Sequence, residues 1–404
     1  MKTYTKFLYK YLIKLVNNRK VVLILWFGAA FYGAIKAITN NYINNYIIFK
    51  HVYFHTVNST NLYLPYPAEY SDVNLYGPFF SLIIAPFTYL PDKAGILLWV
   101  MANAFFLFFA ISKLPVSDKW KNIMLLLSLS ELITTSVALE TNALVCACIM
   151  LGFSYTKKEK DIWALFFIVA AAFIKIYGIA GLAFFIFSKK KLQFAAWAIA
   201  WSVLFFFAPI AFTSFNFLVQ SYADWYDGLT VKGEKNIGLG QESLYQNISL
   251  LGMIRRIFYL PQLNDALILI PAFFLFVSQY MRYKFINDTE YQLYILCSVL
   301  LSIVLFSTGS ESPTYIIAIP AMILWYLLQP KTKWVTIFFI IAFLFTTFTY
   351  SDIFTPWART HLSKPYSLKA FFPFVIWMII LVQIHIRQFL KAMQSFGPMK
   401  LAKT

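Results

Sequence analysis

Apolar runs recur along the chain from Val21 to His385, most of them about 15 to 20 residues long and separated by short polar segments. A helix needs about 20 such residues to cross the hydrocarbon core of a bilayer, and a membrane-spanning barrel would show only a weak alternation of apolar and polar residues. Only 13% of the 404 residues are charged, whereas an average soluble domain has about 25%. The pattern therefore predicts an all-α protein built as a polytopic bundle of transmembrane helices.

About twelve of these runs are predicted to span the membrane. They are residues 21–38, 94–112, 122–139, 142–156, 161–174, 176–188, 192–211, 265–281, 291–308, 313–329, 334–350 and 370–386. One further run, residues 79–90, is too short to cross and has Pro86 inside it. We expect this run to form a re-entrant or interfacial element in the first outer loop.

Positive charges predict the orientation of the bundle. Lys and Arg are enriched in the cytoplasmic loops of membrane proteins, and if 79–90 does not span, about two thirds of the 34 Lys and Arg fall on one side. Both termini are therefore predicted to be cytoplasmic, with outer loops at about 39–93, 212–264 and 351–369. Because no soluble domain is apparent, residues 1–404 are expected to form one integral membrane unit. The net charge of +17 comes from short clusters between apolar runs, which does not indicate nucleic-acid binding.

The sequence does not favour a metal site, a cofactor site or a disulfide framework. All three cysteines, Cys146, Cys148 and Cys297, fall inside apolar runs. His51 and His55 are four residues apart but have no further ligands near them in the sequence. We therefore expect a protein that works with neither a metal nor a cofactor.

The scarce acidic residues gather in the predicted outer loops. Glu69 and Asp72 lie in the aromatic stretch LYLPYPAEYSDVNLYGPFF, Glu140 lies in the turn ETN, and Glu311 lies in GSESPTY. Ionisable groups are costly near a bilayer, so their concentration at one side indicates a functional site. For Glu69 and Asp72, the alternative is a solvated loop without a special role.

Lys175 lies between two apolar runs, 161–174 and 176–188, that are each shorter than a full span. The turn that contains it is therefore expected to lie below the outer surface, where an ammonium group would bind an anion. The alternatives are that Lys175 extends to the lipid headgroups and that Glu140, with Asn142, only caps the next helix.

Transfer of a sugar from a lipid phosphate to a hydroxyl group would use these residue types. One carboxylate acts as a general base that accepts the proton of the attacking hydroxyl. The lipid phosphate leaves as a stable anion, so cationic or amide groups suffice to bind it. An outer cavity that combines carboxylates with lysine or arginine therefore favours this chemistry.

Four segments together resemble glycosyltransferase family 87, whose members have the GT-C fold. They are NNYIIFKHVYFHTVNSTNLYLPYPAEYSDVNLYGPFFSLIIAPFTYLP (44–91), ETNALVCACIMLGF (140–153), FIKIYG (173–178) and QESLYQNISLLGMIRRI (241–257). The resemblance implies an inverting transfer of mannose or another hexose from a polyprenyl-phosphate donor, as in the mannosyltransferase that typifies the family. It also implies that no nucleotide sugar and no obligatory metal are used, and that amphipathic helices lie in the first outer loop.

The resemblance implies site residues at several positions, but this chain differs from the family at the position of the usual acid. Where such enzymes usually carry an acid after the first helix, this chain has Asn44 and Asn45, and an amide does not accept a proton as a carboxylate does. The candidates for the base are, in order, Asp72, Glu69 and Glu140. The candidates for binding the donor phosphate are Lys175, Arg255 and Arg256. The candidates for binding the sugar or the acceptor are Asn45, Tyr76, Asn142, Gln241, Ser243, Asn247, Glu311 and Tyr315.

The expected partners are a polyprenyl-phosphate sugar, a glycolipid or glycan acceptor and membrane lipids. The expected location is the inner (cytoplasmic) membrane of a bacterium, with the active site on the periplasmic face. The alternative function is a lipid-linked oligosaccharide flippase or a transporter, which would place its working acids at the membrane midplane, where Glu131 is predicted to lie.

Overall fold

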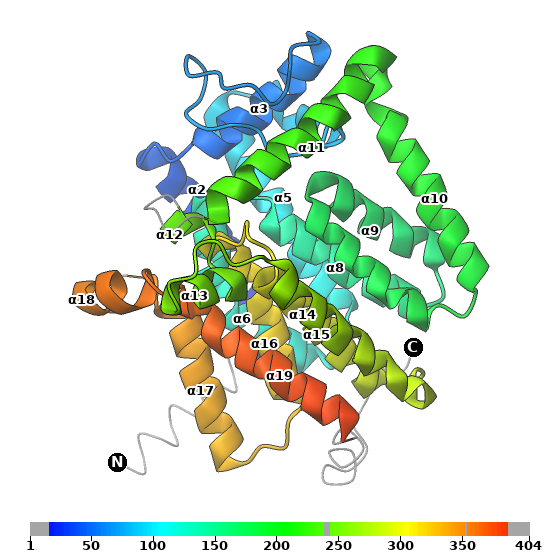
Figure 1. The fold of residues 1–404 in the computed structure, drawn as a ribbon, viewed down its shortest axis with the longest axis vertical. Coiled ribbons are helices and arrows are strands. Elements are labelled where there is room, and N and C mark those ends of the chain that lie inside the picture. Colours follow the sequence, from blue (N-terminus) through cyan, green and yellow to red (C-terminus); the bar gives the residue numbers. More distant parts are fainter. Residues whose placement is uncertain (1–15, 238–242, 352–353, 387–404) are drawn as a thin grey trace.

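The computed structural model describes residues 16–237, 243–351 and 354–386, and all the regular structure in these ranges is helical (Figure 1). Five helical segments are long and apolar enough to cross a membrane. These are α2 (Arg19–Thr39), α5 (Asp92–Lys113), α10 (Lys191–Phe207) with η2 (Ala208–Ala211), α14 (Ala266–Ser278) with η3 (Gln279–Phe285), and η6 (Leu368–Ala370) with α19 (Phe371–His385).

Other helices complete the bundle or lie outside it. Shorter apolar helices are α9 (Asp161–Ile174), η1 (Ile176–Phe187), α15 (Thr289–Leu305), η4 (Ser312–Ile316) with α16 (Ala318–Leu328), and α17 (Lys333–Phe348). The remaining helices are α3 (Asn44–Val57), α4 (Phe80–Thr88), α6 (Asp118–Leu127), α7 (Leu129–Val137), α8 (Asn142–Lys157), α11 (Phe215–Ile237), α12 (Ser243–Gln246), α13 (Leu250–Ile257), α18 (Pro356–Ala358) and η5 (Arg359–Ser363).

The all-α prediction is confirmed for the described residues, and each predicted span coincides with one helix or with two consecutive helices. The count of twelve spans and the cytoplasmic location of the termini stay predictions, because only five segments qualify as candidate spans by length and composition. The short pair around Lys175 consists of an α-helix, α9, and a 3₁₀ helix, η1. Since a 3₁₀ helix rises about 2.0 Å per residue against about 1.5 Å in an α-helix, η1 is longer than its residue count suggests.

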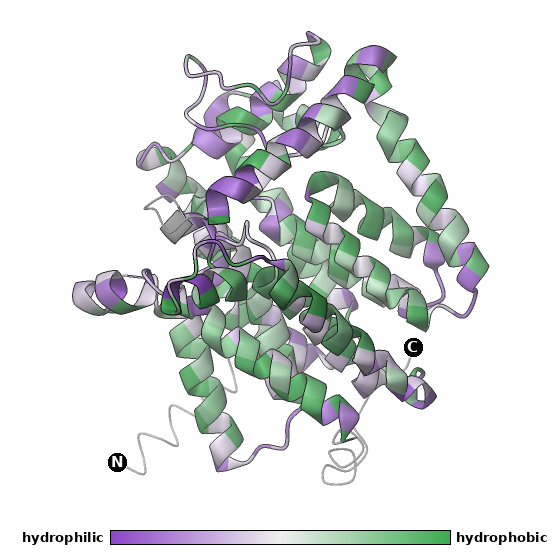
Figure 2. Cartoon of the chain, in the orientation of Figure 1, coloured by the Kyte–Doolittle hydropathy of each residue, from purple (hydrophilic) through white to green (hydrophobic). Residues whose placement is uncertain are grey.

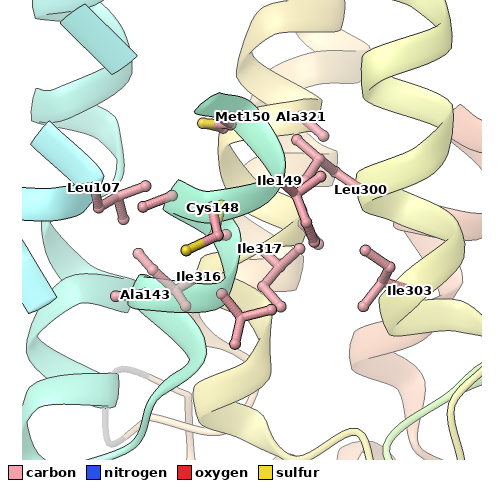
Figure 3. Packing of buried hydrophobic residues seen from close by; sticks show 14 of the residues in the cluster. Leu107, Ala143, Cys148, Ile149, Met150, Leu300, Ile303, Ile316, Ile317 and Ala321 are labelled. Carbon is pink, nitrogen blue, oxygen red and sulfur yellow. The ribbon is translucent and has the colours of Figure 1, made fainter. Parts of the chain in front are cut away.

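Helix α8 forms the centre of the core. All its residues except Tyr155 and Lys157 are buried, so it is apolar all round, as a helix surrounded by others must be. Figure 3 shows Ile149 and Met150 of α8 lying among Leu107 of α5, Leu300 of α15 and Ala321 of α16. This packing fixes the turn that precedes α8, from which two polar side chains of the site extend.

One end of the molecule, the end predicted to face outward, is polar and is built from α3, α11 and the loop between α3 and α4 (Figure 2). We call residues 58–79 the 58–79 loop. It is fastened beneath α11, because the Trp225 indole Nε1–H donates to the Leu75 carbonyl over 2.9 Å. At Gly77 a Cβ atom would lie 2.6 Å from the Phe173 carbonyl and 2.9 Å from the Trp225 ring, so only glycine permits this approach.

Helix α4, which follows this loop, has nine residues and contains Pro86. At about 1.5 Å per residue it is far shorter than the hydrocarbon core of a bilayer, about 30 Å thick. It packs against α3 and α5. The run 79–90 is therefore too short to span as a helix, and its re-entrant or interfacial position stays a prediction.

Candidate functional site

A polar cavity of about 450 Å³ lies at the polar end of the bundle, between α3, the 58–79 loop, α11 and the turns before α8 and η1. Five charged side chains line it: Asp72, Glu140, Lys175, Lys232 and Glu311. They come from segments that are far apart in the sequence, so the fold alone brings them together. Within the described ranges, no group of three or more His, Cys, Asp or Glu side chains is placed to hold a metal ion.

The turn that carries Glu140 is held in an uncommon backbone conformation. Leu139 has a φ of 56°, in the left-handed region that costs a non-glycine residue free energy. Two side chains fix the turn: the Trp99 indole donates to the Leu139 carbonyl over 3.1 Å, and Asn45 donates to the Ala138 carbonyl over 2.8 Å. The carboxylate of Glu140 is thereby held at the cavity wall.

Glu140 and Lys175 form the central ion pair of the site, with 2.8 Å between Lys175 Nζ and Glu140 Oε2. Lys175 also donates to Asn142 Oδ1 over 3.1 Å, and the Tyr177 hydroxyl donates to the same oxygen over 2.7 Å. The Tyr76 hydroxyl donates to Glu140 Oε2 over 3.1 Å. Asn142, Tyr76 and Lys175, all predicted from the sequence, thus belong to one network around Glu140.

Lys175 stays charged in this environment. Burial alone would lower the pKa of its ammonium group, but Glu140 and the hydroxyls of Tyr177 and Tyr76 raise that pKa well above the usual value. The ammonium group also lies 5.1 Å from the centre of the Tyr76 ring. A permanent positive charge therefore lies at the base of the cavity, where it can bind an anion.

Asp72 and Lys232 form a second ion pair in the cavity lining, which is looser than the pair of Glu140 and Lys175. The Lys232 Nζ is 4.0 Å from Asp72 Oδ2, and the Asp72 side chain is 50% exposed against 11% for Glu140. Asp72 Oδ1 accepts from the Val73 amide over 2.8 Å, which orients the carboxylate. The Asp72 carboxylate is therefore accessible to a hydroxyl group that enters the cavity.

Glu311 lines the opposite wall, at the start of η4. Burial raises the pKa of Glu311 to about 7, Glu140 and Asp72 add to this rise, and Lys175 and Lys232 oppose it. Together with Glu311, these four charged neighbours describe the electrostatics of the cavity: three carboxyl groups and two ammonium groups interact across one small space. With this raised pKa, the Glu311 carboxyl group is readily protonated near neutral pH.

Glu311→Gln is expected to change how stability depends on pH. The raised pKa means that folding favours the protonated acid, so its contribution is fully present below pH 4.5 and is lost as pH rises through about 7. The variant has no proton to lose, so its melting temperature relative to the wild type should increase from pH 5 to pH 8, by about 2–4 °C for each kcal/mol. Thermal unfolding of the detergent-solubilised protein at both pH values measures this, and an equal difference at both would contradict it.

Glu69, the second candidate base, lies outside the cavity lining. Its Oε2 accepts from His55 Nε2 over 2.9 Å and is 3.7 Å from His51 Nε2. The pKa of His55 is lowered, mainly by burial, so the neutral imidazole donates this hydrogen bond. The ring of His55 packs against Tyr66, with 4.4 Å between centres. Glu69 therefore fastens the 58–79 loop to α3.

The two arginines predicted to bind the donor phosphate have protein partners and are not among the residues that line the cavity. Arg255 is paired with Asp265, 2.6 Å away, and donates to the Leu263 carbonyl over 2.9 Å. Arg256 donates to the Asn247 carbonyl over 3.1 Å and contacts Ser367. Both are buried and hold α13 to its neighbours.

The other candidates from the sequence divide between the site and the core. Asn45 lines the cavity and donates to Glu140 Oε1 over 3.4 Å. Asn247 is buried and donates to the Asn236 carbonyl, and Tyr315 is buried and donates to the Ile248 carbonyl. Gln241 lies outside the described residues, and Ser243 begins α12 without a described side chain.

A second, apolar cavity of about 640 Å³, which we call the apolar groove, lies between η1, α14 and α15. It is lined almost entirely by aliphatic and aromatic side chains, such as Ala180, Phe273 and Ile303. Tyr177 and Ser307 line both this apolar groove and the polar cavity. The two spaces therefore border on each other at these two residues, which we call the junction, close to Lys175 in the same turn as Tyr177.

Sequence reasoning missed Lys232, Asn236 and Tyr177 as site residues. Lys232 and Asn236 belong to α11, whose residues give no motif, and their place at the cavity depends on how α11 lies across the outer end (Figure 1). For Tyr177 a signal was present, because it lies in the same turn as Lys175.

The model of glycosyltransferase family 87 matches residues 74–308 of this chain, which is more than half of it. The matched range contains Tyr76, Glu140, Lys175 and Lys232, whereas Asp72 and Glu311 lie just before and just after it. A comparison with curated proteins gave no match.

Proposed function

The chain belongs to glycosyltransferase family 87, and on this premise we propose that it transfers a hexose from a polyprenyl-phosphate donor to a glycolipid or glycan acceptor at the outer face of the membrane. The donor class, the acceptor and the face of the membrane are the proposed parts. The observation that carries the proposal is the junction of the charged cavity with the apolar groove at Tyr177 and Ser307.

A polyprenyl-phosphate sugar has an apolar chain and a charged, hydroxyl-rich head, so it needs two joined spaces of opposite character. The groove between η1, α14 and α15 suits the isoprenoid chain, because it offers apolar side chains from three helices. The polar cavity suits the sugar, and Lys175, close to the junction, suits the phosphate. A soluble nucleotide sugar has no apolar chain that could fill the groove.

The proposed reaction is a single displacement with inversion. Asp72 accepts the proton of the acceptor hydroxyl while that oxygen bonds to the anomeric carbon of the donor sugar. The bond between the anomeric carbon and the phosphate oxygen breaks, and the electron pair leaves with polyprenyl phosphate. Lys175 stabilises the negative charge on this leaving group.

The assignment of the base to Asp72 is supported by access. Asp72 lines the cavity with half of its side chain exposed and only a loose ion pair, whereas Glu140 is engaged by Lys175 and Tyr76. Glu69, the second candidate from the sequence, is held by two histidines outside the cavity. Asp72 therefore remains the first choice for the base.

A flippase or transporter is not supported by the position of Glu131. Its carboxylate pairs with Lys369 at 3.0 Å, both side chains are 1% exposed, and Lys369 also donates to Ser312 Oγ. An acid that works in transport has to be reached by its cargo or by protons along a polar pathway. Glu131 instead joins three helices in the core.

The proposed function is tested by incubating the purified protein with a panel of synthetic polyprenyl-phosphate sugars and candidate acceptors. Release of polyprenyl phosphate together with a product of inverted anomeric configuration is the expected result. Transfer from a nucleotide sugar, or movement of lipid-linked sugar across vesicles without chemistry, would contradict it.

Ala180→Trp is expected to block the groove. The larger side chain would occupy space that the isoprenoid chain needs, so KM for a long-chain donor should rise about tenfold or more, with a much smaller rise for a donor that has a short chain. Leu182→Trp on the same helix is the control, because Leu182 does not line the groove. Equal effects of Ala180→Trp on long and short donors would contradict this placement of the chain.

A further inference from the structure

One face of α11 forms a wall of the polar cavity. Tyr226, Leu229, Thr230 and Gly233 are spaced so that they lie on the same side of a helix, and all four line the cavity. The adjacent face fastens α11 to the 58–79 loop, since Asn61 donates to Asp224 over 2.7 Å. The helix is therefore held in place by one face while the other borders the cavity.

Two residues leave this wall open for a ring-shaped ligand. The Tyr226 side chain is 71% exposed although it lines the cavity, so its ring lies at the mouth and is accessible. A Cβ atom added at Gly233 would meet nothing within 4 Å. Glycine weakens a helix interior by about 1 kcal/mol relative to alanine, and the packing of the described residues gives no reason for it here.

Asn236, about one turn beyond Gly233 along this wall, has an unused hydrogen-bond acceptor. The residue is 3% exposed, and its Nδ2 donates to the Thr308 carbonyl over 3.1 Å. Its Oδ1 has no partner among the described residues, although it is buried. A buried acceptor without a donor is costly, so a ligand that brings a hydroxyl group to the cavity would satisfy it.

We propose that this face of α11 is the acceptor subsite and that it binds a pyranose ring, the terminal sugar of a glycan or glycolipid. The Tyr226 ring contacts the apolar face of the sugar, the space at Gly233 admits the ring, and Asn236 Oδ1 accepts from one of its hydroxyl groups. Asp72, whose carboxylate lies 4.0 Å from Lys232 of the same helix, receives the proton of the reacting hydroxyl. This inference rests on the proposed function and adds to it the place where the terminal sugar of the acceptor binds.

A sugar suits this wall better than a peptide or a simple lipid alcohol. The wall offers an exposed aromatic ring for an apolar contact with a sugar. A carboxylate and an unpaired amide oxygen nearby can form hydrogen bonds with its hydroxyl groups. A lipid alcohol would need an apolar channel of its own, and the apolar groove is assigned to the donor.

Gly233→Trp tests the subsite, with Val231→Trp as the matched control. Val231 belongs to the same helix, is exposed and does not line the cavity. With the full chain in detergent micelles and a saturating long-chain donor, Gly233→Trp is expected to raise KM for a sugar acceptor at least tenfold. Slow hydrolysis of the donor by water, measured without acceptor, should continue, because water needs no subsite. Val231→Trp should match the wild type in both assays.

Tyr226→Ala is the second variant, with Val219→Ala, another exposed and non-lining position of α11, as its control. The expected result is an acceptor KM raised about fivefold to tenfold, with donor KM unchanged. Unchanged acceptor KM in both Gly233→Trp and Tyr226→Ala would overturn the subsite. Transfer by the wild type to a peptide or an alkyl alcohol in preference to a sugar would overturn the acceptor class. If the wild type used no polyprenyl-phosphate donor at all, the proposed function itself would fail, which is a different outcome.

Discussion

Asp72→Asn is expected to lower the rate of sugar transfer by about 10²–10⁴-fold, the usual contribution of a general base. The amide has the shape of the carboxylate but cannot accept a proton at neutral pH. Asp72 is half exposed and its one ion pair, with Lys232, is 4.0 Å long, so the substitution should leave the fold intact. Single-turnover transfer from a synthetic donor, together with thermal unfolding of the same preparation, measures both expectations.

The matched control for this prediction is Glu69→Gln. Glu69 lies three residues before Asp72 on the same loop, but it accepts a hydrogen bond from His55 and does not line the cavity. A glutamine oxygen can accept the same bond from a neutral imidazole, so transfer should stay within a few fold of the wild type. If Glu69→Gln abolished transfer and Asp72→Asn did not, the base would have been assigned to the wrong carboxylate. Full activity in Asp72→Asn, Glu140→Gln and Glu311→Gln alike would exclude a carboxylate base at this cavity.

Lys175→Met is expected to destabilise the protein by about 3–5 kcal/mol and to abolish donor binding. Removing one partner of a buried ion pair leaves the other charge uncompensated, and here that charge is Glu140, 11% exposed and 2.8 Å from the ammonium group. The same change removes the cation proposed to bind the phosphate. Denaturant unfolding and binding of a fluorescent polyprenyl phosphate measure the two effects.

The double variant Lys175→Met/Glu140→Gln separates stability from binding. Neutralising Glu140 as well removes the unpaired charge, so most of the lost stability should return. Binding of polyprenyl phosphate should not return, since no ammonium group remains at the base of the cavity. Recovery of binding in the double variant would mean that Lys175 serves only to neutralise Glu140.

The sequence predicted the helices well, because crossing a membrane requires long apolar runs that are visible without any partner. It could not predict that the segment after Lys175 is a 3₁₀ helix, since the apolar pattern of η1 does not distinguish the two helical forms. The grouping of Glu140, Asn142 and Lys175 was partly foreseeable from the two turns that carry them. The count of spans and their orientation stay predictions.

The remaining site residues depend on contacts between distant segments. Arg255 has a partner ten residues away, and Glu69 has one on α3, and neither pairing leaves a trace in local sequence. Lys232 and Asn236 reach the cavity only because α11 lies across it. Periodicity alone shows that α11 has two faces but not which face borders a ligand.

The apolar groove and the mouth of the polar cavity are bordered by different elements. The groove is formed between η1, α14 and α15, whereas the mouth is bordered by α11 and the 58–79 loop. For a transferase with one lipid product and one glycan product, we expect the lipid to leave through the groove and the glycan to leave through the mouth. Spent carrier could return to the bilayer while the lengthened glycan is still docked, so that a fresh donor enters without waiting for the acceptor to leave.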